Sequence, residues 1–196
     1  LFSIHPSTQE VSLDYLQKKL DLRNNQEILN TIVKAMGTYI DEALNKENTL
    51  KMKFLAAHME HMLSQSLMNL SMRESLQGKL GHIYYYLNDY SKAKDLLEKT
   101  LSELKGQNTE YEKIAETLMY LGDVYSVLSD YEKARNLSQE SVEIYQNHLP
   151  KDYLGTAKAF AYLGNVYRRL GNYEKAKELC EQSLEIYKQH NLQNSI

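Results

Sequence analysis

The sequence predicts an all-α fold: an α-solenoid of three helix pairs, preceded by an N-terminal helical region. Three observations predict it. An 18-residue passage recurs with changes at residues 79–96, 120–137 and 162–179. Only 2 prolines and 8 glycines interrupt the 196 residues, so long helices can form. Hydrophobic residues make up 42% and charged residues 25%, which is typical of a folded chain rather than a disordered one.

The recurrence is marked by Leu-Gly pairs at Gly81, Gly122 and Gly164, which lie 41 and 42 residues apart. A period of this length indicates stacked units, none of which buries its own apolar face alone. In each unit the leucine precedes a tyrosine by four residues, so both lie on one face of a helix. A glycine inside a helix costs about 1 kcal/mol, which is tolerable where a second helix must approach closely.

The second helix of each unit begins at an Asp-Tyr or Asn-Tyr pair. The side-chain oxygens of Asp89, Asp130 and Asn172 are suited to cap a helix N-terminus. An alanine three residues after each tyrosine is expected where the two helices cross. We therefore expect helix pairs at 71–87 and 90–105, 109–128 and 131–148, and 152–170 and 173–189. They divide the array, 71–196, into repeats at about 71–107, 108–150 and 151–190.

Residues 1–70 are expected to be helical without the repeat signature. Ser7 and Glu10 form a capping box before VSLDYLQKKL, and Ser71 and Glu74 another before the first repeat. Asn24 and Glu27 open a second helix, and LKMKFLAAHMEHMLSQSL is a third. We expect these helices to cover the first face of the array as an N-terminal cap and connector. The second helix has an apolar stripe of Ile28, Ile32, Ala35, Met36, Tyr39, Ile40 and Ala43.

The composition limits the partners and the compartment. The net charge of −3, from 23 basic and 26 acidic residues, argues against nucleic acid and anionic membrane surfaces. No apolar run is long enough to cross a bilayer. The single cysteine, Cys180, rules out an intrachain disulfide framework and indicates a reducing compartment, so we expect a cytoplasmic protein. A chain that begins at Leu1 without a leader is expected to be a piece of something longer.

The sequence gives little support for a catalytic site or a metal site. His58, Glu60 and His61 lie close together, but zinc needs three or four ligands and no further ones complete a set. Cys180 has no histidine beside it in the pattern and is interpreted as a structural thiol. The 16 tyrosines fall mostly at repeat positions, which favours core packing over stacking on bases. No nucleophile–base set or cofactor loop occurs, so we expect no enzyme and no cofactor.

The pattern Leu-Gly-x-x-Tyr-x-x-Leu-x-Asp-Tyr-x-Lys-Ala resembles the tetratricopeptide repeat across residues 71–189. The 41–42-residue period resembles the kinesin-light-chain-like subgroup rather than the 34-residue standard. Two departures are Asn88 and Ser129, which replace the turn glycine retained at Gly171. The resemblance implies a curved array whose first helices line a concave groove that binds a peptide or protein segment.

The resemblance also implies which residues line this groove. The expected lining changes along the array, from aromatic in the first repeat, through acidic and apolar in the second, to basic in the third. A ligand segment with acidic residues at one end and apolar residues at the other would complement it. The expected lining residues are His82, Tyr85 and Tyr86 from the first repeat, Glu116, Met119, Asp123 and Ser126 from the second, and Lys158, Asn165, Arg168 and Arg169 from the third.

Two alternatives stay open. The segment FSIHPSTQEVSLDYL, with His5, Gln9 and Val11, resembles the end of the winged-helix region that follows NB-ARC modules in STAND-type switch proteins. That resemblance implies that residues 1–20 are the tail of such a region, and that the repeats are the sensor of an NTPase whose nucleotide-binding domain lies outside this chain. The second alternative is self-assembly, because the last helix lacks the polar cap such arrays need. Leu184 and Tyr187 then face solvent or another copy, giving a homo-oligomer.

Overall fold

The computed structural model describes residues 26–46, 48–64, 68–106 and 110–190, and within them the chain forms eight helices and no strand. The all-α prediction is therefore confirmed. The six repeat helices begin and end within two residues of the expected positions. The helices are α2 (Gln26–Asn45), α3 (Thr49–Ser64), α4 (Leu70–Tyr86), α5 (Tyr90–Lys105), α6 (Tyr111–Val127), α7 (Tyr131–His148), α8 (Tyr153–Arg169) and α9 (Tyr173–Gln189).

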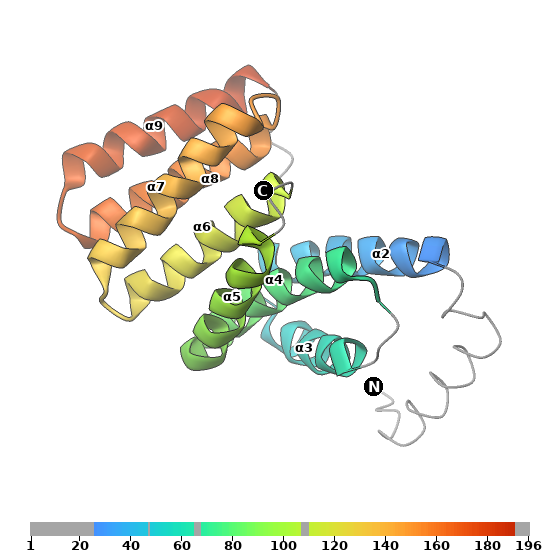
Figure 1. Cartoon of the computed structure of the whole chain (residues 1–196). Coiled ribbons are helices and arrows are strands. Elements are labelled where there is room, and N and C mark those ends of the chain that lie inside the picture. Colours follow the sequence, from blue (N-terminus) through green and yellow to red (C-terminus); the bar gives the residue numbers. More distant parts are fainter. Residues whose placement is uncertain (1–25, 47, 65–67, 107–109, 191–196) are drawn as a thin grey trace.

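The helices stack as successive pairs from α2 at one end to α9 at the other (Figure 1). Helix α4 packs on α5, α6 on α7, and α8 on α9. The first helices of neighbouring pairs also contact one another, from α2 to α4, α6 and α8, whereas the second helices form no comparable layer. Because the first helices approach one another more closely, they line the inner side of the stack and the second helices lie outside.

The Leu-Gly glycines lie where the two helices of a pair approach most closely, as expected. A methyl group at any of them would collide with, or crowd, a side chain of the second helix. The contacted residue lies 16 positions further along in each repeat, so the same crossing is built three times. A Cβ would lie 2.5 Å from Leu97 Cγ at Gly81, 2.5 Å from Ser138 Oγ at Gly122, and 3.1 Å from Cys180 Sγ at Gly164.

The second helices are capped as predicted. The side chains of Asp89, Asp130 and Asn172 accept hydrogen bonds from backbone N–H groups three residues later. The alanines of this segment are buried at the crossings. The turn residues before these caps adopt the left-handed conformation, with φ of 62° at Asn88, 66° at Ser129 and 79° at Gly171.

Tyrosine hydroxyls tie each first helix to the second helix of the pair before it. The hydroxyl of Tyr125 donates to Glu98 on α5, and Tyr167 on α8 accepts from Gln139 Nε2 on α7 at 3.3 Å. The hydroxyl of Tyr84 donates in the same way to Glu60 on α3. Helix α3 therefore occupies the place of a second helix, and α2 with α3 stacks on α4 as a further helix pair.

One local expectation for the front of the chain holds in part and another is wrong. In the expected stripe of α2, Ile40 and Ala43 are buried and Ile28, Ile32 and Met36 pack against the core, whereas Ala35 and Tyr39 are exposed. Leu29, Val33 and Leu44, outside that stripe, are buried as well. The cap of α4 is Asn69, whose side chain accepts from the N–H of Met72, so the Ser71–Glu74 box does not form. Ser71 hydrogen-bonds Glu110 instead, while Glu74 is buried. The expected features at His5, Ser7, Gln9, Glu10, Val11 and Asn24 lie outside the described residues.

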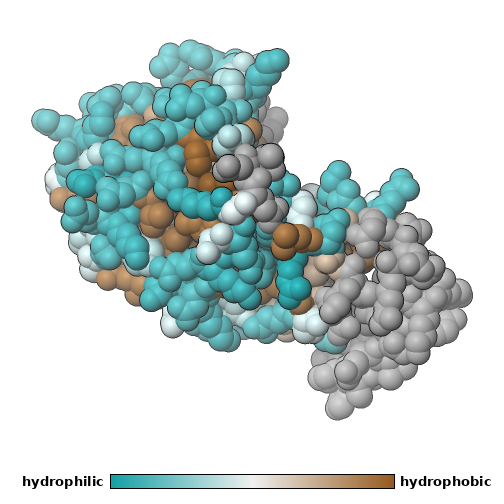
Figure 2. All heavy atoms as spheres, viewed as in Figure 1, coloured by the Kyte–Doolittle hydropathy of each residue, from teal (hydrophilic) through white to brown (hydrophobic). Residues whose placement is uncertain are grey.

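The surface is mostly hydrophilic in the view of Figure 2, with apolar side chains gathered in hollows between helices. None of the described helices has the length and hydropathy needed to cross a bilayer.

Candidate binding surface on the inner helices

All the expected groove residues lie on the first helices α4, α6 and α8, but their accessibility differs. Met119 and Ser126 are buried in the helix packing and present almost no surface. His82 and Asp123 are also buried. The remaining positions keep accessible surface: Tyr85, Glu116 and Asn165 are half-buried, and Tyr86, Lys158, Arg168 and Arg169 are exposed.

Polar side chains from α4, α6 and α8 form a connected network. Arg168 donates from Nε and Nη2 to Asn165 Oδ1, at 3.2 and 2.8 Å. Asn165 Nδ2 in turn lies 3.4 Å from Asp123 Oδ1. The Tyr85 hydroxyl hydrogen-bonds Asp123 from the other side. The structure thus brings these four expected residues together.

Asp123 is held by donors and is not turned toward solvent. Burial raises the pKa of its carboxyl group, while the hydrogen bond from Tyr85 and the charge of Arg169 oppose that rise. Burial, together with the neighbouring Asp123 charge, raises the pKa of the Tyr85 hydroxyl. The acidic position expected in the middle of the groove is therefore largely masked.

His82 lies at the centre of an aromatic cluster that spans the same three helices. Its ring stacks on Tyr120, with centroids 3.9 Å apart, and meets Tyr86 edge-on at 5.0 Å. The Tyr162 hydroxyl lies 3.2 Å from His82 Nε2. Burial lowers the pKa of His82 to about 3, and the charges of nearby lysines contribute, so the ring is neutral at neutral pH.

Sequence reasoning missed the roles of Tyr120 and Tyr162. Their signal is the tyrosine directly before the repeat Leu-Gly pair, which is present in the second and third repeats, whereas the first repeat has Lys79 at the matching position. The missing tyrosine ring at this position of α4 leaves the aromatic cluster asymmetric, with His82 supplied by α4 and tyrosines by α6 and α8.

A pocket of about 490 Å³ opens between α2, α4 and α6 on the inner side. Each of these helices contributes one lysine: Lys34, Lys79 and Lys113. Lys79 lies along α2, where a Cβ at Gly37 would be 3.5 Å from its Cε. The ammonium group of Lys113 lies 2.6 Å from Ser71 Oγ, 3.2 Å from Glu110 and 4.0 Å from the buried Glu74. These lysines were not among the expected groove residues, because α2 was expected to cover the end of the array and not to line a pocket with α4 and α6.

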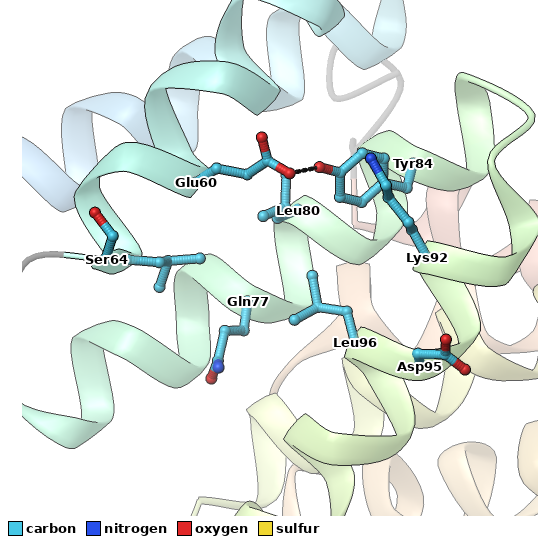
Figure 3. Close-up of a pocket in the computed structure, with 9 residues that line it drawn as sticks. Glu60, Ser64, Gln77, Leu80, Tyr84, Lys92, Asp95 and Leu96 are labelled. Atoms are coloured by element: carbon cyan, nitrogen blue, oxygen red, sulfur yellow. Dashed lines mark hydrogen bonds between the residues drawn. The ribbon is translucent and has the colours of Figure 1, made fainter.

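A second pocket, of about 500 Å³, lies on the outer side between α3, α4 and α5 (Figure 3). Figure 3 shows the Tyr84 hydroxyl pointing across to Glu60, with Leu80 and Leu96 below them. At the matching place between α5 and α7, Lys133 bonds the Tyr125 hydroxyl at 2.6 Å. Both lysines also lie over the tyrosine rings, Lys133 at 4.2 Å from the Tyr125 centroid and Lys92 at 5.0 Å from the Tyr84 centroid.

The other candidates for chemistry have ordinary surroundings. The ring of His58 lies against that of Phe54 at a tilt of 34°, with ring centroids 4.1 Å apart. No group of three or more metal-ligating side chains is found among the described residues. Cys180 is an exposed thiol on α9.

Comparison with known proteins places these features in a family. Residues 113–189 and 75–102 each match a tetratricopeptide repeat model. No significant match is found among curated proteins. A putative kinesin light chain from Podosopora anserina with nearly identical TPR-like repeats superposes with a TM-score of 0.56 at 18% identity, over 85% of this chain and 77% of that one.

Other solved structures share the fold at similarly low identity. Bacillus thuringiensis PlcR, solved with the peptide PapR7 and DNA, superposes with a TM-score of 0.62 at 15% identity, over 92% of this chain and 74% of that one. BtubC (BKLC) from P. vanneervenii gives 0.50 at 15% identity, over 96% and 93%. With family matches over more than half of its sequence, and with helix pairs joined by repeated caps, crossings and tyrosine bonds, the chain belongs to the tetratricopeptide repeat family.

Proposed function

We propose that this chain is a non-catalytic binding module, and that it holds a peptide or protein segment rich in acidic residues on its inner face. Tetratricopeptide repeats generally mediate protein and peptide binding and are typically non-catalytic. The structure of PlcR with a peptide, on the same fold, gives further support.

The distribution of charge on the inner face carries the proposal. Lys158, Arg168 and Arg169 are exposed at one end of the face. Lys34 and Lys79 line the inner pocket at the other end, where Lys113 is already paired with Glu110. The carboxyl group of Asp123 lies within the array, where it is buried and hydrogen-bonded. Acidic side chains can therefore meet cations at both ends without strong repulsion from the middle.

The aromatic residues between the two basic ends suit an apolar stretch of the ligand. Tyr86 is 38% exposed and Tyr85 is half-buried beside it, with ring centroids 5.5 Å apart in an edge-to-face arrangement. Such rings combine a large contact area with little loss of side-chain entropy. The expected ligand is thus acidic toward its ends and apolar between them, either extended or helical.

The test is a selection of short random peptides displayed on phage, made on the immobilised full chain. Peptides rich in Asp and Glu should be enriched, and their affinity should fall as salt rises. Replacing both Arg168 and Arg169 by Glu should weaken binding of the selected peptides by about tenfold or more. Circular dichroism should still show the folded helical chain, with a lower melting temperature, because the bonds from Arg168 to Asn165 are lost and acidic side chains at the C-terminus of α8 oppose the helix dipole.

The matched control replaces Lys53 and Lys151 by Glu. Both lysines are exposed, on α3 and in the α7–α8 loop, and the double substitution changes the net charge equally. This control should bind the selected peptides like the wild type. Equal weakening by both double variants would show a general charge effect, and unchanged binding by the arginine variant would refute the groove assignment.

A further inference from the structure

Among the helices that the structure describes, the last pair, α8 and α9, forms the end of the stack, and its end face is not covered by a further helix as the other pairs are. Helix α6 covers the pair α4–α5, and α8 covers α6–α7. Three matching positions of the second helices show the result: Leu97 and Ser138 are buried, whereas Cys180 is exposed. Met119 is likewise buried on α6, whereas Ala161 is exposed at the same position of α8. Among the described residues, therefore, no helix covers the α8–α9 face.

This end face offers space for a further helix to pack. A pocket of about 320 Å³ lies between α8 and α9, and its walls include Ala161, Gly164, Tyr173, Ala176 and Cys180. Small residues on its floor let a further helix approach closely, as Gly81 does for Leu97 within a pair.

Along α9 the open face continues as a seam. Tyr173 is 69% exposed and Leu184 is 51% exposed, and Lys177 and Cys180 are exposed between them. Tyr187, half-buried, follows at the next position. The intervals alternate between four and three residues, which is the spacing of a helix that packs along another helix. We define the α9 seam as Tyr173, Lys177, Cys180, Leu184 and Tyr187.

We propose that the α9 seam pairs antiparallel with the α9 seam of a second copy of this chain, with Cys180 close to the two-fold axis. The seam is nearly symmetric about this residue. Tyr173 and Tyr187 lie seven positions to either side of it, and Ala176 and Leu184 lie four positions to either side. Antiparallel pairing sets a tyrosine near a tyrosine and places the large Leu184 over the pocket between α8 and α9, where the buried Ala176 forms part of the wall. Such self-complementarity is what a two-fold interface requires.

The charges of the seam agree with the same arrangement. Arg168 and Lys177 line the pocket at the N-terminal end of α9. Glu181 and Glu185 are exposed toward its C-terminal end. Lys177 pairs with Glu181 at 3.8 Å on the surface, and an exposed ion pair of this kind is easily exchanged. Reversing the direction of the second helix brings Lys177 of each copy toward Glu181 and Glu185 of the other.

The experiment measures the mass of the full chain by light scattering after size exclusion, across a range of concentrations. The expected result is a dimer that dissociates on dilution. Leu184→Glu should weaken the dimer by about tenfold or more, because two carboxylates would enter the interface. The matched control is Leu50→Glu on α3: Leu50 is 70% exposed, and its replacement should leave the dimer intact.

A cross-link locates the axis independently. Cys180 is the only cysteine of the sequence, so a short bis-maleimide can join two chains only through this residue. The wild-type dimer should cross-link efficiently, and Cys180→Ser should abolish the product. A chain that stays monomeric at every concentration would overturn the proposal. So would a dimer that survives Leu184→Glu or fails to cross-link.

Discussion

The imidazole ring of His82 lies against the ring of Tyr120, with the two planes inclined by only 13°. The pair joins α4 to α6 inside the inner layer, and Tyr162 extends it to α8 through its hydroxyl group. Because burial lowers the pKa of His82 to about 3, a proton on this ring would oppose the packing of all three helices.

Stability should therefore depend on pH through His82. In the unfolded chain its pKa is about 6.5, so between pH 3 and 6.5 the unfolded state binds a proton that the folded state does not. The contribution of His82 to the free energy of unfolding is therefore complete above pH 6.5, and it is lost as the pH falls from 6.5 toward 3. Between pH 7 and 4 the wild type should lose about 3 kcal/mol more than His82→Phe.

Urea unfolding at several pH values measures this difference. The opposite contribution of Asp123, whose folded pKa is raised, is common to both proteins and cancels in the comparison. Parallel stability curves for wild type and variant would show that His82 is not held neutral by burial.

Two helical glycines should respond oppositely to alanine. At Gly122 a Cβ would lie 2.5 Å from Ser138 Oγ and 3.2 Å from the Ala134 carbonyl, so Gly122→Ala should destabilise by about 1–3 kcal/mol. At Gly78 the nearest atom, Thr117 Oγ1, is 3.6 Å away. Gly78→Ala should therefore stabilise by about 0.5–1 kcal/mol through helix propensity alone. Thermal unfolding of both variants checks the signs, and a shared sign would contradict the proposed close crossing.

Exchanging serine and glycine at two matching turns tests whether the left-handed conformation of the turn residue affects stability. Ser129 has φ of 66° and Gly171 has φ of 79°, at matching turns. Ser129→Gly should raise the free energy of unfolding by about 0.5–1 kcal/mol, because glycine adopts this conformation without strain. Gly171→Ser should lower it by a similar amount, although no atom crowds that position. Denaturant midpoints that move in the reverse directions would show that turn conformation does not decide stability here.

The tyrosine bonds between neighbouring pairs should differ in strength. Tyr125 donates to the carboxylate of Glu98, whereas Tyr167 accepts from the neutral amide of Gln139. Tyr125→Phe should cost about 1.5 kcal/mol and Tyr167→Phe about 0.5–1 kcal/mol, because bonds to charged groups are stronger. Chemical denaturation gives both values. A larger loss at Tyr167 than at Tyr125 would argue against the order expected from charge.

The repeat could be predicted from the sequence because the residues that define it lie close together in the chain. Each Asp-Tyr or Asn-Tyr pair within the described residues caps a helix, and the Leu-Gly glycine marks a close crossing with a residue only 16 positions away. The caps of α5, α7 and α9 and the crossing residues of each pair were therefore predicted together with the helix bounds, whereas the cap of α4 was not.

The parts that escaped prediction depend on contacts between distant residues. Helix α3 has neither a Leu-Gly pair before it nor an Asp-Tyr start; Asn48 accepts from Lys51 N instead. Its role becomes visible only through the bond from Tyr84 to Glu60. The inner pocket was hidden for the same reason, since Lys34 gains its neighbours only when α2 packs on α4. Burial of Met119 and Asp123 likewise requires α8 to be in place.

Hydrogen exchange with mass spectrometry, on the full chain with and without a peptide from the display selection, tests the central claim most directly. Binding on the inner face should slow amide exchange in α4, α6 and α8, and in α2 beside the inner pocket. The second helices α5 and α7 should change little. Protection confined to α5 and α7, with α4, α6 and α8 unaffected, would contradict the account.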